Sequence, residues 1–303
     1  MATKNKKLIV IAGPTAVGKT AVAIDIARHL QTEIISADSR QCYRELNIGV
    51  ARPSEEELSA VKHHFIASHS IHEKVNAVTF EQYALAALEN IYRDRDIAVV
   101  VGGTGLYINA LLEGMDEIPG VPEILHNELI HEYNKNGLEW LQDQVRTLDP
   151  AFYEKGEIQN PQRLLRALEV WKATGRSLMD FRKGEKTPRY FDVIKIGLQL
   201  PQADLHHNIN KRVEAMMEHG LLEEVRLLIP WQHLNALQTV GYRELFDHFN
   251  GEISLAGAIE RIKISTRQYA KRQLTWFRKD NEYHWCLPGV THVQSYLRNI
   301  SVS

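Results

Sequence analysis

The sequence has few cysteines, no long apolar run and no excess of either charge, and each absence excludes a class of protein. Only Cys42 and Cys286 occur among 303 residues, too few for a disulfide scaffold and typical of a reducing compartment. The apolar stretch after the basic N-terminus covers only residues 8–12, whereas a membrane helix needs about 20 residues. We therefore expect a cytoplasmic protein without a membrane partner. The net charge of −2 excludes a uniformly basic nucleic-acid-binding protein but leaves room for a basic patch.

Hydrophobic patterning divides the chain into a sheet-forming part and a helical part. Short apolar runs rich in β-branched residues predict parallel strands at 8–12, 33–37 and 97–101. Helical patterns occur near 122–135, 138–148 and 161–174 with almost no strand signal, and a strand pattern returns at 191–200. We therefore expect an α/β fold, with a parallel-sheet core formed by 1–114 and 191–303 and an inserted all-helical domain at 115–190.

Local signals mark two helix starts, and the pattern of the C-terminal third is mainly helical. Residues 54–57 and 79–82 both resemble capping boxes, so we expect helices to begin at Ser54 and Thr79. After Pro201 the pattern is mainly helical, at 203–219, 221–229, 241–249 and 254–279.

A phosphate-binding motif lies between the first predicted strand and the first predicted helix. Residues 13–20, called the P-loop below, fit G-x-x-x-x-G-K-[ST] in the strand–loop–helix context that makes the pattern specific. Its glycines let backbone N–H groups converge on an anion at the N-terminus of a helix. The motif predicts a diphosphate site and does not by itself specify ATP. The residues expected to bind are Gly13, Pro14, Thr15, Ala16, Val17, Gly18, Lys19 and Thr20.

Carboxylates at strand ends distinguish between kinds of P-loop protein. The strand at 97–101 ends in Gly102-Gly103-Thr104, without the acidic residue that ordinarily holds Mg²⁺ in a P-loop NTPase, so phosphoryl transfer is disfavoured. Asp38 instead follows the strand at 33–37, and the carboxyl ends of parallel strands face one crevice. Asp38 is therefore a candidate general base or metal ligand, with a turn cap as the structural alternative.

Six motifs in order resemble one family over nearly the whole chain. They are GPTAVGKT at 13–20, ADSRQ at 37–41, GGTGLY at 102–107, NPQRLLRALEV at 160–170, VGYREL at 240–245 and TRQYAKRQLTWFR at 266–278. In these motifs the chain resembles the bacterial tRNA dimethylallyltransferases, also called tRNA isopentenyltransferases. The resemblance implies a P-loop core, an inserted helical domain that grips the anticodon stem-loop, and Mg²⁺ as cofactor. We expect a monomer.

The resemblance also implies an activity and a set of residue roles. The enzyme would transfer a dimethylallyl group from dimethylallyl diphosphate to the N6 amine of the adenine on the 3′ side of the anticodon. Lys19 and Arg212 would hold the diphosphate, and Thr20 would bind Mg²⁺. Asp38 would accept the proton of the amine, since a positioned base contributes about 10²–10⁴-fold. Thr104 would touch the reacting groups.

Residues expected to contact tRNA lie in several of these motifs and in a basic segment. Residues 261–279 hold seven basic side chains, no acidic one, and interleaved aromatics, as in surfaces that bind phosphates and stack on bases. By resemblance the contacts are Asp38, Ser39, Arg40, Gln41, Thr104, His126, Gln162, Arg163, Leu164, Leu165, Arg166, Val240, Gly241, Tyr242, Lys271, Arg272, Gln273, Leu274, Thr275, Trp276, Phe277 and Arg278. At His126 the family more often has a basic residue.

Three other functions compete with this interpretation. A transferase that prenylates a free adenine nucleotide would need neither the insertion nor the basic segment. A P-loop small-molecule kinase would turn over ATP and make a phosphorylated product. An RNA-binding module with a vestigial P-loop would keep its function when Asp38 is replaced by alanine.

Overall fold

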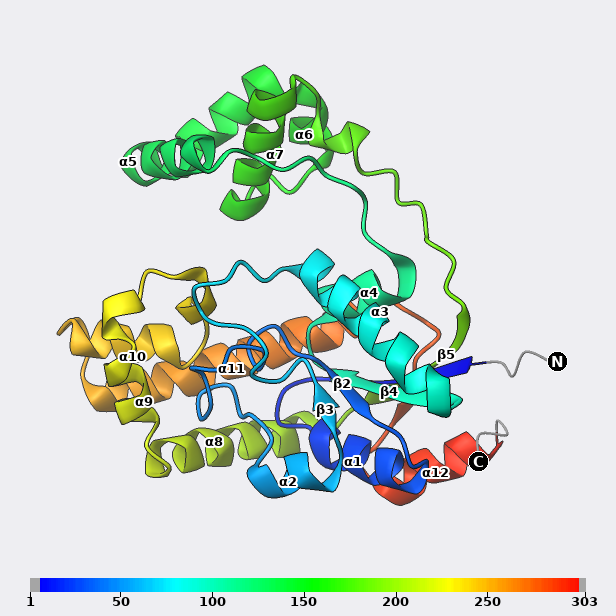
Figure 1. Cartoon of the computed structure of the whole chain (residues 1–303). Coiled ribbons are helices and arrows are strands. Elements are labelled where there is room, and N and C mark those ends of the chain that lie inside the picture. Colours follow the sequence, from blue (N-terminus) through cyan, green and yellow to red (C-terminus); the bar gives the residue numbers. More distant parts are fainter. Residues whose placement is uncertain (1–5, 300–303) are drawn as a thin grey trace. The chain divides into compact units, whose positions relative to one another are not determined.

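Residues 6–299 of the computed structural model are described, and contacts divide the chain into two compact units (Figure 1). Unit 1 comprises residues 1–113 and 188–303, and unit 2 comprises residues 114–187. These limits lie within three residues of the domain boundaries expected from the sequence. Within residues 6–299 no helix is both long and apolar enough to span a membrane.

Unit 1 is built on a parallel sheet. Between residues 6 and 299 the sheet has six strands in the order β3-β2-β4-β1-β5-β6, and every pair is parallel. The strands are β1 (Lys6–Ala12), β2 (Ile34–Ala37), β3 (His63–His64), β4 (Ile97–Gly102), β5 (Phe191–Leu198) and β6 (His284–Cys286). The sequence did not predict β6, because three half-exposed residues carry too short a pattern.

Helices cover both faces of this sheet, with α1 and α12 on one face and α3 and α4 on the other (Figure 1). The helices of unit 1 are α1 (Lys19–His29), α2 (Glu55–Ala60), α3 (Ala77–Asp94), α4 (Gly105–Glu113), α8 (Gln202–Glu218), α9 (Leu221–Leu227), α10 (Tyr242–Phe249), α11 (Leu255–Phe277) and α12 (Val290–Asn299), with 3₁₀ turns η2 (Ile229–Trp231) and η3 (Asn235–Leu237). The capping box at Ser54 is confirmed. The predicted start at Thr79 is wrong, because Asn76 caps α3 and Thr79 is the third residue of the helix.

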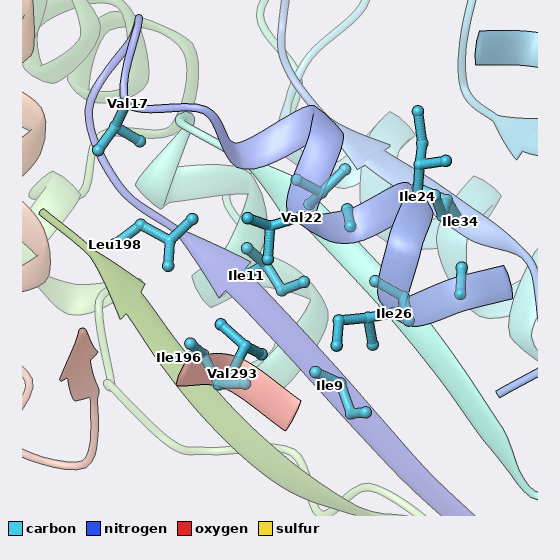
Figure 2. Close-up of a cluster of buried hydrophobic side chains, with 14 of the residues drawn as sticks. Ile9, Ile11, Val17, Val22, Ile24, Ile26, Ile34, Ile196, Leu198 and Val293 are labelled. Atoms are coloured by element: carbon cyan, nitrogen blue, oxygen red, sulfur yellow. The ribbon is translucent and has the colours of Figure 1, made fainter. Parts of the chain in front are cut away.

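The core of unit 1 lies between the sheet and α1 (Figure 2). Ile9 and Ile11 of β1 point to this face, where Ile26 of α1 and Val293 of α12 meet them. All four side chains are fully buried. Each contributes about 1.5–3 kcal/mol to folding, so the strand ends are held on a rigid base.

Unit 2 is all helical, as expected. It contains α5 (Glu123–Leu148), α6 (Pro150–Lys155), α7 (Pro161–Thr174) and the 3₁₀ turn η1 (Leu178–Asp180). The two helices expected at 122–135 and 138–148 are one element interrupted at Gly137, whose φ is 78°. The sequence missed α6, which begins where the buried Asp149 accepts from Phe152 N at 3.0 Å and from Leu178 N at 3.3 Å.

Candidate active site

The candidate site begins where three neighbouring strands end. The last residues of β1, β4 and β2 are aligned in register across the sheet. The residues that follow them are Gly13, Gly103 and Asp38, which therefore lie at the same edge. A Cβ at Gly102 would stand 2.1 Å from the carbonyl oxygen of Ala37, so only glycine lets these strand ends approach so closely.

The P-loop leaves β1 through a tight turn and enters α1 with open N–H groups. A Cβ at Gly13 would lie 2.6 Å from the carbonyl oxygen of Leu198, which accounts for glycine there. Gly18 has a φ of 96° at the N-cap of α1, and no side chain caps the helix. Ala16 and Val17 turn buried side chains toward the core, so they offer an anion their backbone only. The helix N-terminus is thus left for a ligand.

Lys19 lies inside this loop in an environment that weakens its charge. Its Nζ donates to the carbonyl oxygen of Pro14 at 2.6 Å. Burial, together with the nearby Arg212 guanidinium, lowers the pKa of Lys19 to about 7, although the Asp38 carboxylate acts in the opposite direction. A bound anion would offset both causes, since an opposite charge favours the charged amine.

Arg212 reaches the P-loop from α8. Its Nη1 donates to Thr15 Oγ1 at 3.3 Å. On the same helix Asn208 donates to the carbonyl oxygen of Ala16 at 3.3 Å, so α8 contacts the loop at two points. Ile209 and Leu205 anchor α8 in the core of unit 1. The structure therefore brings together the two cations that the family resemblance assigned to one site.

Asp38 is held in a turn that fixes its carboxylate. Oδ1 accepts from the backbone N of Arg40 at 2.8 Å and of Gln41 at 3.3 Å. The Asp38 side chain therefore closes a local turn, as the alternative of a turn cap predicted. Both of these bonds use the same oxygen, and the residue also lines two cavities.

Thr104 joins the turn after β4 to the turn after β2. Its Oγ1 accepts from Ser39 N at 3.1 Å, and its backbone N donates to the carbonyl oxygen of Ala37 at 3.2 Å. Its hydroxyl also shares a side-chain hydrogen bond with Tyr269 of α11, whose pKa burial raises to about 12. Thr104 thus holds the backbone beside Asp38, and Tyr269 stays a neutral phenol.

Two cavities meet at these residues. The first, called the anion cavity, has a volume of about 240 Å³ and is lined by P-loop residues, Glu57 and Asp38 among others. The second, called the outer cavity, has a volume of about 370 Å³ and is lined by parts of α8 and α11 and by residues 238–241. Six residues line both cavities and are called the neck. They are Thr15, Asp38, Val50, Ala51, Arg212 and Tyr269. A molecule gripped in the anion cavity would therefore meet one in the outer cavity beside Asp38.

Comparison with known proteins identifies the family. Residues 41–280 match the family model described as IPP transferase. The chain belongs to the IPP transferase family. It is 47% identical to the tRNA dimethylallyltransferase of Christiangramia forsetii over 278 residues, which cover 92% of each chain. It is 45% identical to that of Flavobacterium johnsoniae over 286 residues, covering 92% of this chain and 93% of the relative.

Solved structures of the IPP transferase family have the same fold. The full-length tRNA isopentenylpyrophosphate transferase of Bacillus halodurans matches with a TM-score of 0.71 and 33% identity, covering 98% of this chain and 96% of that one. A eukaryotic dimethylallyltransferase acting on tRNA matches with a TM-score of 0.74 and 28% identity, covering 90% of this chain and 70% of that one. The α/β fold expected from the sequence is confirmed.

Helix α11 carries the basic segment that the family resemblance assigns to tRNA, but only one of its faces is exposed. Of the residues 271–278 that the resemblance assigns to tRNA, the exposed ones are Lys271, Arg272, Thr275, Trp276 and Arg278. The structure contradicts direct contacts by Gln273 and Phe277, which are buried, and Leu274 packs against the core. Basic residues nearer the helix start have protein partners, since Lys263 pairs with Glu214 at 2.9 Å and Arg267 donates to Asn210 at 2.7 Å.

The segment 240–242 is only partly available to a ligand. Val240 and Gly241 line the outer cavity. Tyr242 is fully buried, and its hydroxyl donates to Glu224 Oε1 at 2.6 Å, so the expected tRNA contact by this side chain is wrong. Glu224 also accepts from the backbone N of Gly49 at 3.0 Å. Tyr242 therefore supports the loop that carries Val50 and Ala51 to the neck.

The turn after Asp38 places two side chains at the outer cavity and one behind it. Ser39 and Arg40 line the outer cavity, and Arg40 Nη1 donates to the carbonyl oxygen of Asn235 at 3.0 Å. Gln41 Nε2 instead donates to the carbonyl oxygens of Val50 and Ala51, at 3.2 Å and 2.9 Å. Gln41 thus holds the backbone of the neck residues Val50 and Ala51 in place, a role that sequence reasoning missed.

Unit 2 holds the remaining residues assigned to tRNA. Gln162 and Arg163 are exposed at the start of α7. Leu164 is fully buried in the core of unit 2, with Leu165 packed against it, so the structure contradicts a tRNA contact by Leu164. His126 Nδ1 and Arg166 Nη1 both pair with the buried Glu169, at 2.6 Å and 3.4 Å.

Tyr269 is a neck residue that sequence reasoning placed with the base-stacking aromatics. It lies four residues before Gln273 on α11, and helical spacing puts both side chains on one face. That face meets the P-loop and the turn after β4. The spacing alone could have grouped them, but only the fold shows which face of α11 is covered.

Proposed function

We propose that this IPP transferase moves a dimethylallyl group from its diphosphate to the N6 amine of the tRNA adenine on the 3′ side of the anticodon. The observation that carries the proposal is the neck, whose residues, the Asp38 carboxylate among them, line both the anion cavity and the outer cavity. The named activity of the relatives, which are 40–47% identical and span nearly the same length, supports the same reaction.

The anion cavity supplies what a departing diphosphate needs. As the bond between the allylic carbon and the diphosphate oxygen breaks, its electron pair leaves with the diphosphate. Lys19, Arg212 and the N-terminus of α1 surround that charge in fixed positions, so they stabilise the transition state more than the intact substrate. The group that moves is then carbon, and the phosphates stay where they are bound.

Asp38 is the proposed general base. The lone pair of the adenine amine is delocalised, so the amine attacks carbon well only if its proton leaves as the new bond forms. In this reaction the amine nitrogen bonds to the allylic carbon, and the N6 proton passes to the Asp38 carboxylate. The hydrogen bonds to Oδ1 from the backbone of the turn hold the carboxylate at the neck.

Mg²⁺ is the proposed cofactor, and the lining of the anion cavity fits it. Mg²⁺ prefers oxygen ligands and usually takes part of its shell from substrate phosphates and water. The Thr20 hydroxyl and the carboxylates of Asp38 and Glu57 line one cavity. No cluster of three or more acidic, histidine or cysteine side chains suited to a metal occurs in the described part of the chain, so the diphosphate itself would complete the shell. When bound, the ion would neutralise leaving-group charge.

The tRNA is proposed to bind through α11 and unit 2. Lys271 and Arg278 expose charge, and Trp276 exposes an aromatic side chain on α11. In unit 2 burial and the charges of Arg163 and Arg166 lower the pKa of Arg182, while Asp116 and Glu157 act in the opposite direction. Arg163, exposed at the start of α7, is the arginine of this group that we propose to meet a tRNA phosphate.

A competition between acceptors tests this function. The protein is incubated with labelled dimethylallyl diphosphate, Mg²⁺ and equal concentrations of an anticodon stem-loop and AMP. We expect label in the stem-loop only. Transfer to AMP would indicate the free-nucleotide prenyltransferase. In a parallel incubation with ATP, transfer of its phosphate would indicate a kinase. We also propose that the enzyme works as a monomer in the cytoplasm. The unpaired state of Cys42 and Cys286 supports the compartment, because thiols stay reduced there.

A further inference from the structure

We infer that Gln273 is a positioning residue that fixes the two loops on which the chemistry depends. Its side chain extends from α11 between the P-loop and the turn after β4. Oε1 accepts from the backbone N of Thr15 at 2.8 Å, and Nε2 donates to the carbonyl oxygen of Gly103 at 2.9 Å. Only 6% of the residue is exposed, so water cannot replace either bond easily.

The close approach of Gln273 requires glycine in the turn after β4. A Cβ at Gly103 would lie 2.1 Å from the Gln273 Nε2 atom and 3.5 Å from the carbonyl oxygen of Gly13. Three residues further along α11, Trp276 makes a similar approach, since a Cβ at Gly105 would lie 2.1 Å from its Nε1. The glycines of the GGTG turn therefore admit one face of α11, and Gln273 is the member of that face that bonds to both loops.

Each of the two loops carries a residue of the site. Thr15 lines the neck, and its Oγ1 accepts from Arg212 Nη1. Gly103 is followed by Thr104, which holds the turn beside Asp38. Gln273 itself lines the anion cavity, but both polar atoms of its amide are bonded to the two loops, so we assign its effect to the positions of Thr15 and Gly103. The inference rests on the proposed function, because it takes the anion that Lys19 and Arg212 would bind to be a diphosphate.

This position gives Gln273 a role different from the one its motif implies. The family resemblance assigns it to tRNA, together with its exposed neighbours Lys271 and Arg272. Both polar atoms of its amide are instead used inside the protein. Loss of the amide should therefore change the binding of diphosphate and the rate, and it should leave the affinity for RNA unchanged.

The experiment is a double-mutant cycle between Gln273 and Arg212. Binding of inorganic diphosphate with Mg²⁺ is measured by calorimetry for the wild type, Gln273→Met, Arg212→Met and the double variant. Gln268→Met is the matched control, because Gln268 is an exposed glutamine on the same helix. We expect Gln273→Met to weaken binding about tenfold and Gln268→Met to change it less than about twofold. The loss of diphosphate affinity in the double variant should be at least about fivefold smaller than the product of the losses in the two single variants.

The outcomes separate the inference from the function on which it rests. No binding of diphosphate by the wild type would contradict the proposed function itself. Binding by the wild type with multiplicative effects of Gln273→Met and Arg212→Met would overturn the inference, since Gln273 would then not act through Thr15. Equal effects of Gln273→Met and Gln268→Met would overturn it as well.

A second variant keeps the test decisive if Gln273→Met does not fold. Gln273→Glu preserves the shape, and its neutral acid can still accept from Thr15 N–H and donate to the Gly103 carbonyl. We expect its deficit in diphosphate affinity relative to the wild type to shrink as the pH is lowered from 8 to 5.5. A deficit that does not change with pH would contradict the two-bond role.

Discussion

The pKa of Lys19 makes the binding of diphosphate depend on pH in a way that can be calculated. For a pKa of about 7, the charged fraction of the free amine falls from about 0.9 at pH 6 to about 0.1 at pH 8. The bound anion raises this pKa, so binding is strongest below pH 7 and weakens as the pH rises through it. The contribution of Lys19 to affinity should therefore fall about tenfold between pH 6 and pH 8.

The assay compares the wild type with Lys19→Met in the same buffers, because ionisation of the ligand then affects both proteins equally. The ratio of their diphosphate affinities, measured by calorimetry, isolates the lysine. We expect the ratio to drop about tenfold from pH 6 to pH 8. A ratio that stays constant over this range would refute the reasoning, since Lys19 would then hold its charge as an exposed lysine does.

Unfolding of the ligand-free protein tests the same pKa with the opposite sign. The pKa of Lys19 is about 7 in the folded state, against 10.5 for the ordinary side chain. Between these values the unfolded state binds more protons, so the free energy of unfolding rises with pH. Relative to Lys19→Met, the wild type should therefore gain thermal stability as the pH is raised from 7 toward 10. A loss over that window would contradict the buried position of the amine.

Three further predictions concern the base, a corrected contact and the basic helix. Asp38→Asn should lower the single-turnover rate by about 10²–10⁴-fold while filter binding shows unchanged RNA affinity; a lost affinity with an unchanged rate would contradict the base. Tyr242→Phe should cost about 1–3 kcal/mol of folding stability in thermal denaturation without weakening RNA binding, because its hydroxyl donates to Glu224 inside the protein. Lys271→Ala should reduce the slope of log affinity against log salt by about 1, whereas Lys263→Ala, which removes a lysine paired with Glu214, should reduce it less; equal slopes would place both at the RNA.

Local features of the site could be predicted from the sequence. The P-loop is specified by glycines and a lysine within eight residues, and its strand and helix follow from the apolar pattern on either side. The alternation of strands and helices also predicted that Asp38 and Gly103 would share an edge. These inferences succeed because parallel strands present their carboxyl ends to one side.

The division between binding and packing residues could not be predicted in the same way. Two motifs contain buried residues, Leu164 in one and Gln273 and Phe277 in the other, beside exposed ones, because a family motif includes both packing and binding residues. Helical spacing separates the faces of α11, yet which face is covered depends on Gly103 and the P-loop, which are far away in sequence. Tyr242 is misassigned for the same reason, since its partner Glu224 belongs to another helix.

The most direct test of the central claim locates the transferred group by mass spectrometry. An anticodon stem-loop is incubated with the protein, dimethylallyl diphosphate and Mg²⁺, then digested and fragmented. The account predicts one dimethylallyl group in place of a proton on the N6 amine of the adenine 3′ to the anticodon, and at least about 100-fold slower accumulation of that product with Asp38→Asn. An unmodified adenine, or a product that carries phosphate instead of the five-carbon group, would contradict it.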